Sequence, residues 1–149
     1  MTGLAQWPAA LENVSLCELI ETQAIGWLRA DARIEALVAD RVWTSVPPNA
    51  PYPFVLIEAF TVTAWNRFRG FGRNVTFQLR AQSQVRGDYE AHQIGDRIAA
   101  ILEGKAAPLP PAKRALWSVD ELPGSSYSDV NAGVLTYHRT VIARVMVQV

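Results

Sequence analysis

The sequence predicts an α+β fold: an antiparallel or mixed β-sheet of about five strands, with two to three helices packed on one face. Helical periodicity and strand-type alternation occupy separate segments of the chain. The expected order is helix, helix, three strands, helix and two strands, without the regular alternation of parallel α/β folds. Two hairpins are longer than the core of a 149-residue domain demands. We therefore expect long protruding hairpins that meet something other than their own body.

Three amphipathic helices are expected. Ser15 is followed three residues later by Glu18, the spacing of a capping box at a helix start. Asp31 can cap a second, short helix. A third helix opens at Asp88 and ends at Gly104. The stripe that the first helix would bury is Leu16, Leu19, Ile20, Ala24, Trp27 and Leu28.

Strand patterns cover Val42–Val46, Phe54–Ala64, Asn74–Gln84 and Ala115–Leu122. The third alternates most cleanly, so one of its faces is expected in the core. Four prolines at 47, 48, 51 and 53 make the first connection stiff and non-helical, while residues 123–133 are rich in turn formers and are expected to form a loop. A last strand follows; its core face would hold Leu135, Tyr137, Val141, Ala143, Val145 and Val147, with Arg139 on the same side.

The composition indicates one globular domain, which we place at residues 15–149, preceded by an N-terminal arm at residues 1–14. Lys+Arg and Asp+Glu both total 14, so the chain lacks the basic field of non-specific nucleic-acid binders. Cys17 is the only cysteine, which excludes an intrachain disulfide and favours a small buried hydrophobe. We expect no membrane span and no signal peptide, and a protein folded in a reducing cytoplasm.

No enzyme motif is found, so no catalytic, cofactor-binding or metal site is expected. His92 and His138 have no metal-ligand spacing, and the first is expected in solvent and the second at the surface or an interface. The glycines at 70 and 72 lack the Lys-Ser/Thr of a phosphate loop. Asp120 and Glu121 are adjacent in a strand, so their side chains point to opposite faces and cannot share an acid–base site.

One charge pattern is notable. Residues 66–73 at a hairpin tip carry a charge of +3, and residues 120–129 carry −3. Two solvated loops would explain this. Alternatively, the tip of one subunit meets the acidic loop of the next, with ion pairs setting register and aromatic residues supplying affinity. Contact of the arginines with passing DNA is a weaker alternative. The residues of this candidate interface are Trp65, Arg67, Phe68, Arg69, Phe71, Arg73, Asp120, Glu121 and Asp129.

Four segments together resemble the tail-completion or tail-terminator proteins of long-tailed phages, prophages and gene-transfer agents, a family formerly catalogued as a domain of unknown function. They are residues 36–43 (ALVADRVW), residues 51–55 (PYPFV), the strand from Asn74 with the helix Tyr89–Leu102, and the closing strand with Tyr137-His138-Arg139. The likeness covers about residues 16–148. The first 15 residues and the arginine-rich tip depart from the pattern.

This resemblance implies a structural virion protein at the tail–head junction, assembled in the bacterial cytoplasm. Members form a ring, commonly hexameric, that caps the tail tube, stops its polymerisation and joins the head-side connector. DNA passes through the lumen without sequence-specific binding. The ring either forms alone or is templated by the tube end.

Two other functions stay open at this point. One is a different neck or head–tail connector component of the same particle. The other is a cellular small-molecule-binding or enzymatic domain, which would need a concave pocket with several titratable residues.

Overall fold

The computed structural model describes residues 16–64, 72–85, 88–106, 114–120, 126–131 and 133–148. Three helices and a mixed six-stranded sheet form an α+β fold, as the sequence predicts. The helices are α2 (Leu16–Ala30), α3 (Ala32–Val38) and α4 (Tyr89–Leu102). The strands are β1 (Val42–Trp43), β2 (Phe54–Ala64), β3 (Gly72–Ser83), β4 (Arg114–Asp120), β5 (Ser126–Asn131) and β6 (Val134–Gln148).

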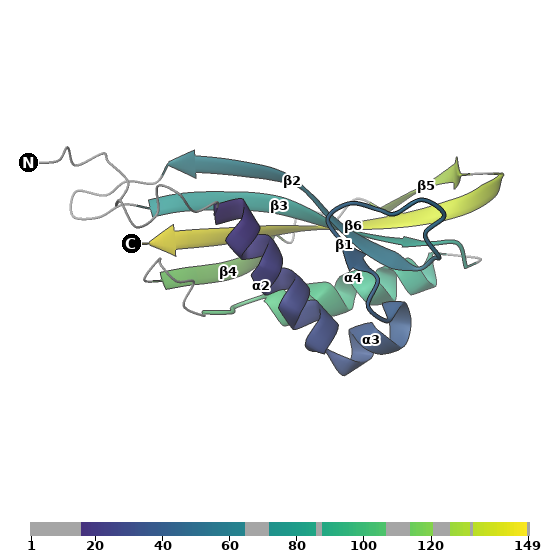
Figure 1. The fold of residues 1–149 in the computed structure, drawn as a ribbon, viewed down its shortest axis with the longest axis horizontal. Coiled ribbons are helices and arrows are strands. Elements are labelled where there is room, and N and C mark those ends of the chain that lie inside the picture. Colours follow the sequence, from purple (N-terminus) through teal and green to yellow (C-terminus); the bar gives the residue numbers. More distant parts are fainter. Residues whose placement is uncertain are drawn as a thin grey trace, which may run out of the picture.

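The sheet has the order β1-β2-β3-β6-β4, and β5 pairs with β6 beyond the end of β4. All pairs are antiparallel except β1 with β2. β6 is therefore an interior strand that pairs with three others: β3 lies along one side, and β4 and β5 share the other. In Figure 1 the three helices lie on one side of the sheet, and β5 with the start of β6 extends beyond them at one end.

The core lies between this sheet and the helices. Its largest fully buried side chains include Trp117 of β4 and Phe77 of β3, whose rings meet edge to face with centroids 6.0 Å apart. Trp27 of α2 meets Trp117 in the same way at 4.8 Å. The alternation in β3 is confirmed, since Val75, Phe77, Leu79 and Ala81 are all fully buried. α4 thus covers the part of the sheet formed by β3, β6 and β4, and α2 lies beside α4 and β1 with Trp27 reaching Trp117.

Local sequence explains the helix boundaries. Asp31 caps α3 because its Oδ1 accepts the backbone N–H groups of Arg33 and Ile34, each at 3.0 Å. α4 begins after Asp88, although the side chain of Asp88 makes no capping bond and instead lies 3.2 Å from His92 Nε2. α4 ends before Gly104, which takes a positive φ of 74°. The first residues of α2, α3 and α4 agree with the helix starts that the sequence predicts.

The sequence-based prediction for 123–133 is wrong. Residues Ser126–Asn131 form β5, paired in full with β6 from Arg139 to Val134. The expected strand Val42–Val46 is shorter, with only Val42 and Trp43 paired, because the proline-rich segment that follows cannot continue the ladder. The prediction that Leu135 lies in the core is also wrong. Its side chain is 44% exposed, because the start of β6 lies beyond the end of the helices.

Candidate assembly interface

Six of the nine residues predicted to form an interface lie outside the described residues: Trp65, Arg67, Phe68, Arg69, Phe71 and Glu121. Arg73, Asp120 and Asp129 are described. Arg73 lies near the start of β3, and Asp120 and Asp129 lie in β4 and β5. Their placement shows where the basic and acidic segments are anchored on the sheet.

The two anchors lie at opposite ends of β6. Arg73 is opposite Val147, whereas Asp129 is opposite Thr136. Eleven residues of an antiparallel strand span roughly 37 Å. Asp120, opposite Ile142, lies between these ends. The structure therefore does not bring Arg73 and Asp129 together within one subunit.

Both described acids of the acidic segment have a partner in their own chain. Asp120 Oδ2 lies 3.4 Å from Arg144 Nη2. Asp129 Oδ1 accepts a hydrogen bond of 2.8 Å from His138 Nε2. These acids would meet a neighbouring subunit as members of polar pairs rather than as isolated charges.

His138 belongs to a polar network on the sheet face that the helices leave uncovered. Glu58 Oε1 lies 3.3 Å from Arg80 Nη2, and Arg80 Nη1 donates to the Tyr127 hydroxyl at 2.9 Å. The Tyr127 ring stacks on His138 with centroids 4.4 Å apart and planes 6° from parallel. The network runs from β2 through β3 and β6 to Asp129 of β5. It fastens β5 to the body of the sheet.

The prediction that His138 lies at the surface is wrong in its exposure, because the residue is only 6% exposed. The ring of Tyr127 from the neighbouring strand covers it. Sequence periodicity places His138 on the face opposite Val141, which is correct, but it cannot show which strand lies above that face. The signal that was missed is the alternation of Tyr127 and Asp129 in a segment that looks like a loop.

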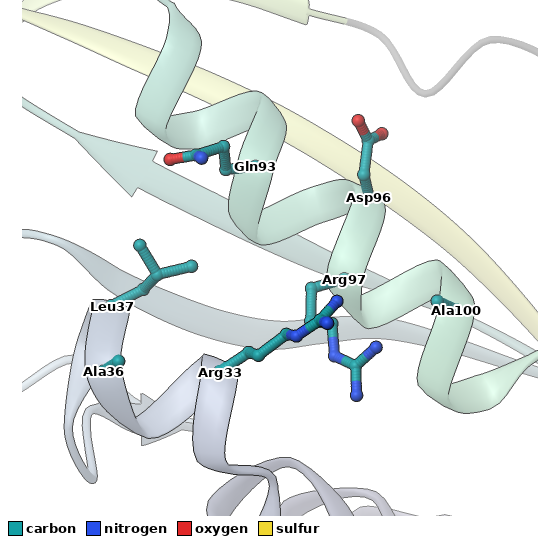
Figure 2. Close-up of a pocket in the computed structure, with 7 residues that line it drawn as sticks. All are labelled: Arg33, Ala36, Leu37, Gln93, Asp96, Arg97 and Ala100. Atoms are coloured by element: carbon teal, nitrogen blue, oxygen red, sulfur yellow. The ribbon is translucent and has the colours of Figure 1, made fainter.

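A shallow groove of about 520 Å³ runs between α3 and α4. Figure 2 shows its lining, with Arg33, Ala36 and Leu37 from α3 facing Gln93, Arg97 and Ala100 from α4, while Asp96 points away from them. Arg97 donates to both carboxylate oxygens of Asp31, with Nε to Oδ1 at 3.2 Å and Nη2 to Oδ2 at 2.6 Å. This bidentate bond lowers the pKa of Asp31 to about 2 and raises the pKa of Arg97.

The groove has little of what catalysis needs. It is lined by two arginines, one aspartate and no histidine, cysteine or serine. Cys17 lies in α2 and does not line this groove. Burial raises the pKa of its thiol, which disfavours the reactive thiolate form. Within the described ranges no cluster of His, Cys, Asp and Glu could hold a metal ion. None of the helices in those ranges is long and apolar enough to cross a membrane.

The described residues form an α+β domain whose long strands carry Arg73 at one end of the sheet and Asp129 at the other. The family described as "Tail completion protein gp17" matches residues 23–146. The chain belongs to this family. It is therefore a structural protein of a phage-type tail, and its location is the virion.

A solved structure shows the same fold. One chain of the structure described as "Virion of native gene transfer agent (GTA) particle" superposes with a TM-score of 0.75 at 18% sequence identity. The match covers 92% of this chain and 100% of that chain. Comparison with curated protein sequences gives no match.

Proposed function

We propose that this chain is the subunit of a ring that caps the tail tube, ends tube polymerisation and presents the surface to which the head-side connector joins. Membership in the tail completion family supports the setting. The observation that carries the ring is the separation of the two charged segments. Arg73, which anchors the basic tip, and Asp129 of β5 lie at opposite ends of the sheet, so a contact between these two parts would have to join different copies.

A contact between two different surface patches is heterologous. When the same contact repeats from copy to copy, the copies form a closed ring if a whole number of the rotations between neighbours makes 360°. In such a ring the basic tip, with Arg67, Arg69 and Arg73, faces the acidic segment with Asp120, Glu121 and Asp129. Trp65, Phe68 and Phe71 supply the apolar anchors. Six copies per ring is the number that the family resemblance implies.

Stopping a polymer requires no catalysis. It needs a surface that fits the last ring of the tube on one side and refuses a further tube subunit on the other. The partners are accordingly the tail tube protein and a head-side connector, with DNA passing through the lumen. The ring either exists beforehand or forms on the tube end, and sedimentation of the purified protein separates these two routes.

The test of termination is tail length. Particles made without this chain are expected to have tubes of uncontrolled length that fail to join heads, as seen by electron microscopy. Tubes of normal length would refute termination. Location against the head portal rather than the tube end would favour the alternative, another neck component of the same particle.

The test of the interface is charge reversal. Arg67→Glu with Arg69→Glu places like charges against the acidic segment and should weaken assembly by up to about 30-fold, since each of the two exposed pairs contributes up to about 1 kcal/mol. Adding Glu121→Arg should partly restore it. Glu121 is preferred because Asp120 and Asp129 have partners in their own chain.

The matched control is Arg33→Glu, an exposed arginine on α3 away from both charged segments. It should assemble normally. If the double variant also assembles normally while folded, the tip is ordinary solvent surface and the charge-keyed interface is wrong.

A further inference from the structure

The outer half of β2 is an open strand edge. β1 pairs with β2 only at Val55 and Leu56. Beyond that point no other strand among the described residues pairs with this side of β2. Residues Thr61–Ala64 are all exposed, and Val62 is 45% exposed. Within the described part of the chain, Thr61–Ala64 thus offers backbone groups that no strand pairs with on this side, along a segment without charge or proline.

Such an edge is unusual for a protein that stays alone. Exposed edges normally carry charges or prolines, or they are covered, because they otherwise recruit further strands. This chain covers β4 in that way. Trp117 N–H donates to Lys105 O at 2.8 Å, and Val119 N–H donates to Glu103 Oε2 at 2.7 Å. Within the described residues, the edge of β4 is thus covered, whereas the edge of β2 at Thr61–Ala64 is not.

A second open edge is found on β5. It pairs with β6 on one side, and the described residues place no strand on its other side. β2 and β6 both run antiparallel to β3, and β5 runs antiparallel to β6. β5 therefore runs antiparallel to β2. If the sheet continued from one copy to the next, β5 would meet β2 in the antiparallel arrangement, which is the more stable one.

The lengths and positions of the two edges also fit. β5 has six residues, which is long enough to pair along all of Thr61–Ala64. Thr61–Ala64 lies level with Arg144–Val147 of β6, whereas β5 lies level with Val134–Arg139. The two centres are about nine residues, or roughly 30 Å, apart along the strands.

Pairing these edges would shift each copy roughly 30 Å along the strands and roughly 19 Å across them, because four strands, β2, β3, β6 and β5, separate equivalent strands of successive copies. Each step is then roughly 36 Å, and six such steps give a circumference of roughly 215 Å. The charges also agree with this arrangement, because the sequence after β2 carries +3 and the sequence before and within β5 carries −3. Because the two ends carry opposite charges, each open edge should pair with another copy of this chain rather than with a strand of a different protein.

We propose that the outer edge of β5 in one copy pairs antiparallel with Thr61–Ala64 of β2 in the next copy, so that a continuous sheet crosses the subunit boundary. The proposal rests on the head-to-tail ring proposed above and identifies its main-chain contact. Backbone hydrogen bonds provide the attachment, and the charged segments set the register.

Disulfide trapping tests the pairing, with Cys17→Ala in every chain. Val62 lies on the helix-covered face, because it is opposite the buried Val75. On β5 the same face holds Ser126, Ser128 and Val130, since Ser126 is opposite Arg139, which packs against Gly95 of α4. Facing residues of antiparallel strands are within the reach of a disulfide.

One chain carries Val62→Cys, and a second carries a cysteine at one of those three β5 positions. Oxidation of the mixture should give dimers that are strongest at one of the three positions. Each variant alone should give none. The matched controls are Thr61→Cys and Thr63→Cys in place of Val62→Cys, because their side chains lie on the other face of β2 and should cross-link poorly with the same β5 positions.

The experiment is run both on the purified chains and on particles assembled from the mixture. Absence of cross-links in both, equal yields from the two faces of β2, or dimers from Val62→Cys alone would overturn the edge pairing. Sedimentation and tail length are measured in parallel. Normal rings and tube lengths without cross-links would reject the edge pairing and leave the ring intact, whereas normal tube length in particles made without this chain would reject the capping ring itself.

Discussion

Replacement of Tyr127 by alanine should loosen β5 without unfolding the domain. The side chain makes two contacts that join β5 to the rest of the sheet: a ring stack on His138 and a hydrogen bond from Arg80 to its hydroxyl. An aromatic stack contributes about 0.5–1.5 kcal/mol, and a hydrogen bond contributes about 1 kcal/mol. Tyr127→Ala should therefore cost about 2 kcal/mol in the local stability of β5.

Native-state hydrogen exchange measures this cost. Because β5 pairs only with β6 among the described residues, it can open locally while the core stays folded. A loss of 2 kcal/mol corresponds to roughly 30-fold faster exchange of the β5 amides that pair with β6, with little change in β3.

Tyr127→Phe is the matched control, since it keeps the stack and removes only the hydroxyl. Its exchange should rise by about 5-fold, which corresponds to about 1 kcal/mol. Equal exchange in the two variants, or acceleration in β3 as large as that in β5, would show that Tyr127 does not anchor β5 in the way that the geometry indicates. If β5 docks onto β2 of the next copy, Tyr127→Ala should also weaken assembly more than Tyr127→Phe does.

Two further predictions concern stability. Asp31→Ala removes the cap of α3 and the bond to Arg97, so urea unfolding at neutral pH should show a loss of about 2 kcal/mol. The charge of Asp31 contributes on the order of 1 kcal/mol of this stability after solvent screening. That contribution is present above pH 4 and should vanish as the pH falls through the folded pKa of about 2. A stability difference between wild type and variant that does not change with pH would contradict the ion pair. Ala59→Gly should raise the melting temperature by about 2–4 °C, because Ala59 has a φ of 60° at the bulge in β2 and a left-handed alanine costs about 1 kcal/mol; a lower melting temperature would show that the bulge is unstrained.

Much of the fold could be predicted from local patterns. The apolar stripe of α2, the capping aspartate before α3 and the alternation of β3 each depend on residues within a few positions of one another. Side-chain periodicity reports burial directly, so these elements and the α+β class follow from the sequence. The absence of any catalytic motif pointed in the same direction as the family to which the chain belongs.

The candidate interface could be predicted only in part. The opposite charges of the two segments are visible in the sequence, but their separation along β6 is not, because it depends on the register of β3 and β5 against that strand. The partners of Asp120 and Asp129 were also missed, since Arg144 and His138 are distant in sequence and come close only in the sheet.

The sequence by itself determined the helices, the long strands and the unequal distribution of charge, because each is encoded in neighbouring residues. Tertiary structure alone decided that Ser126–Asn131 is a strand and that His138 is buried. Turn formers such as Asp129 and Asn131 of β5 belong to residue types that are depleted in strands. They become a strand only when hydrogen bonds to β6 satisfy their backbone groups, and that pairing is a property of the whole sheet.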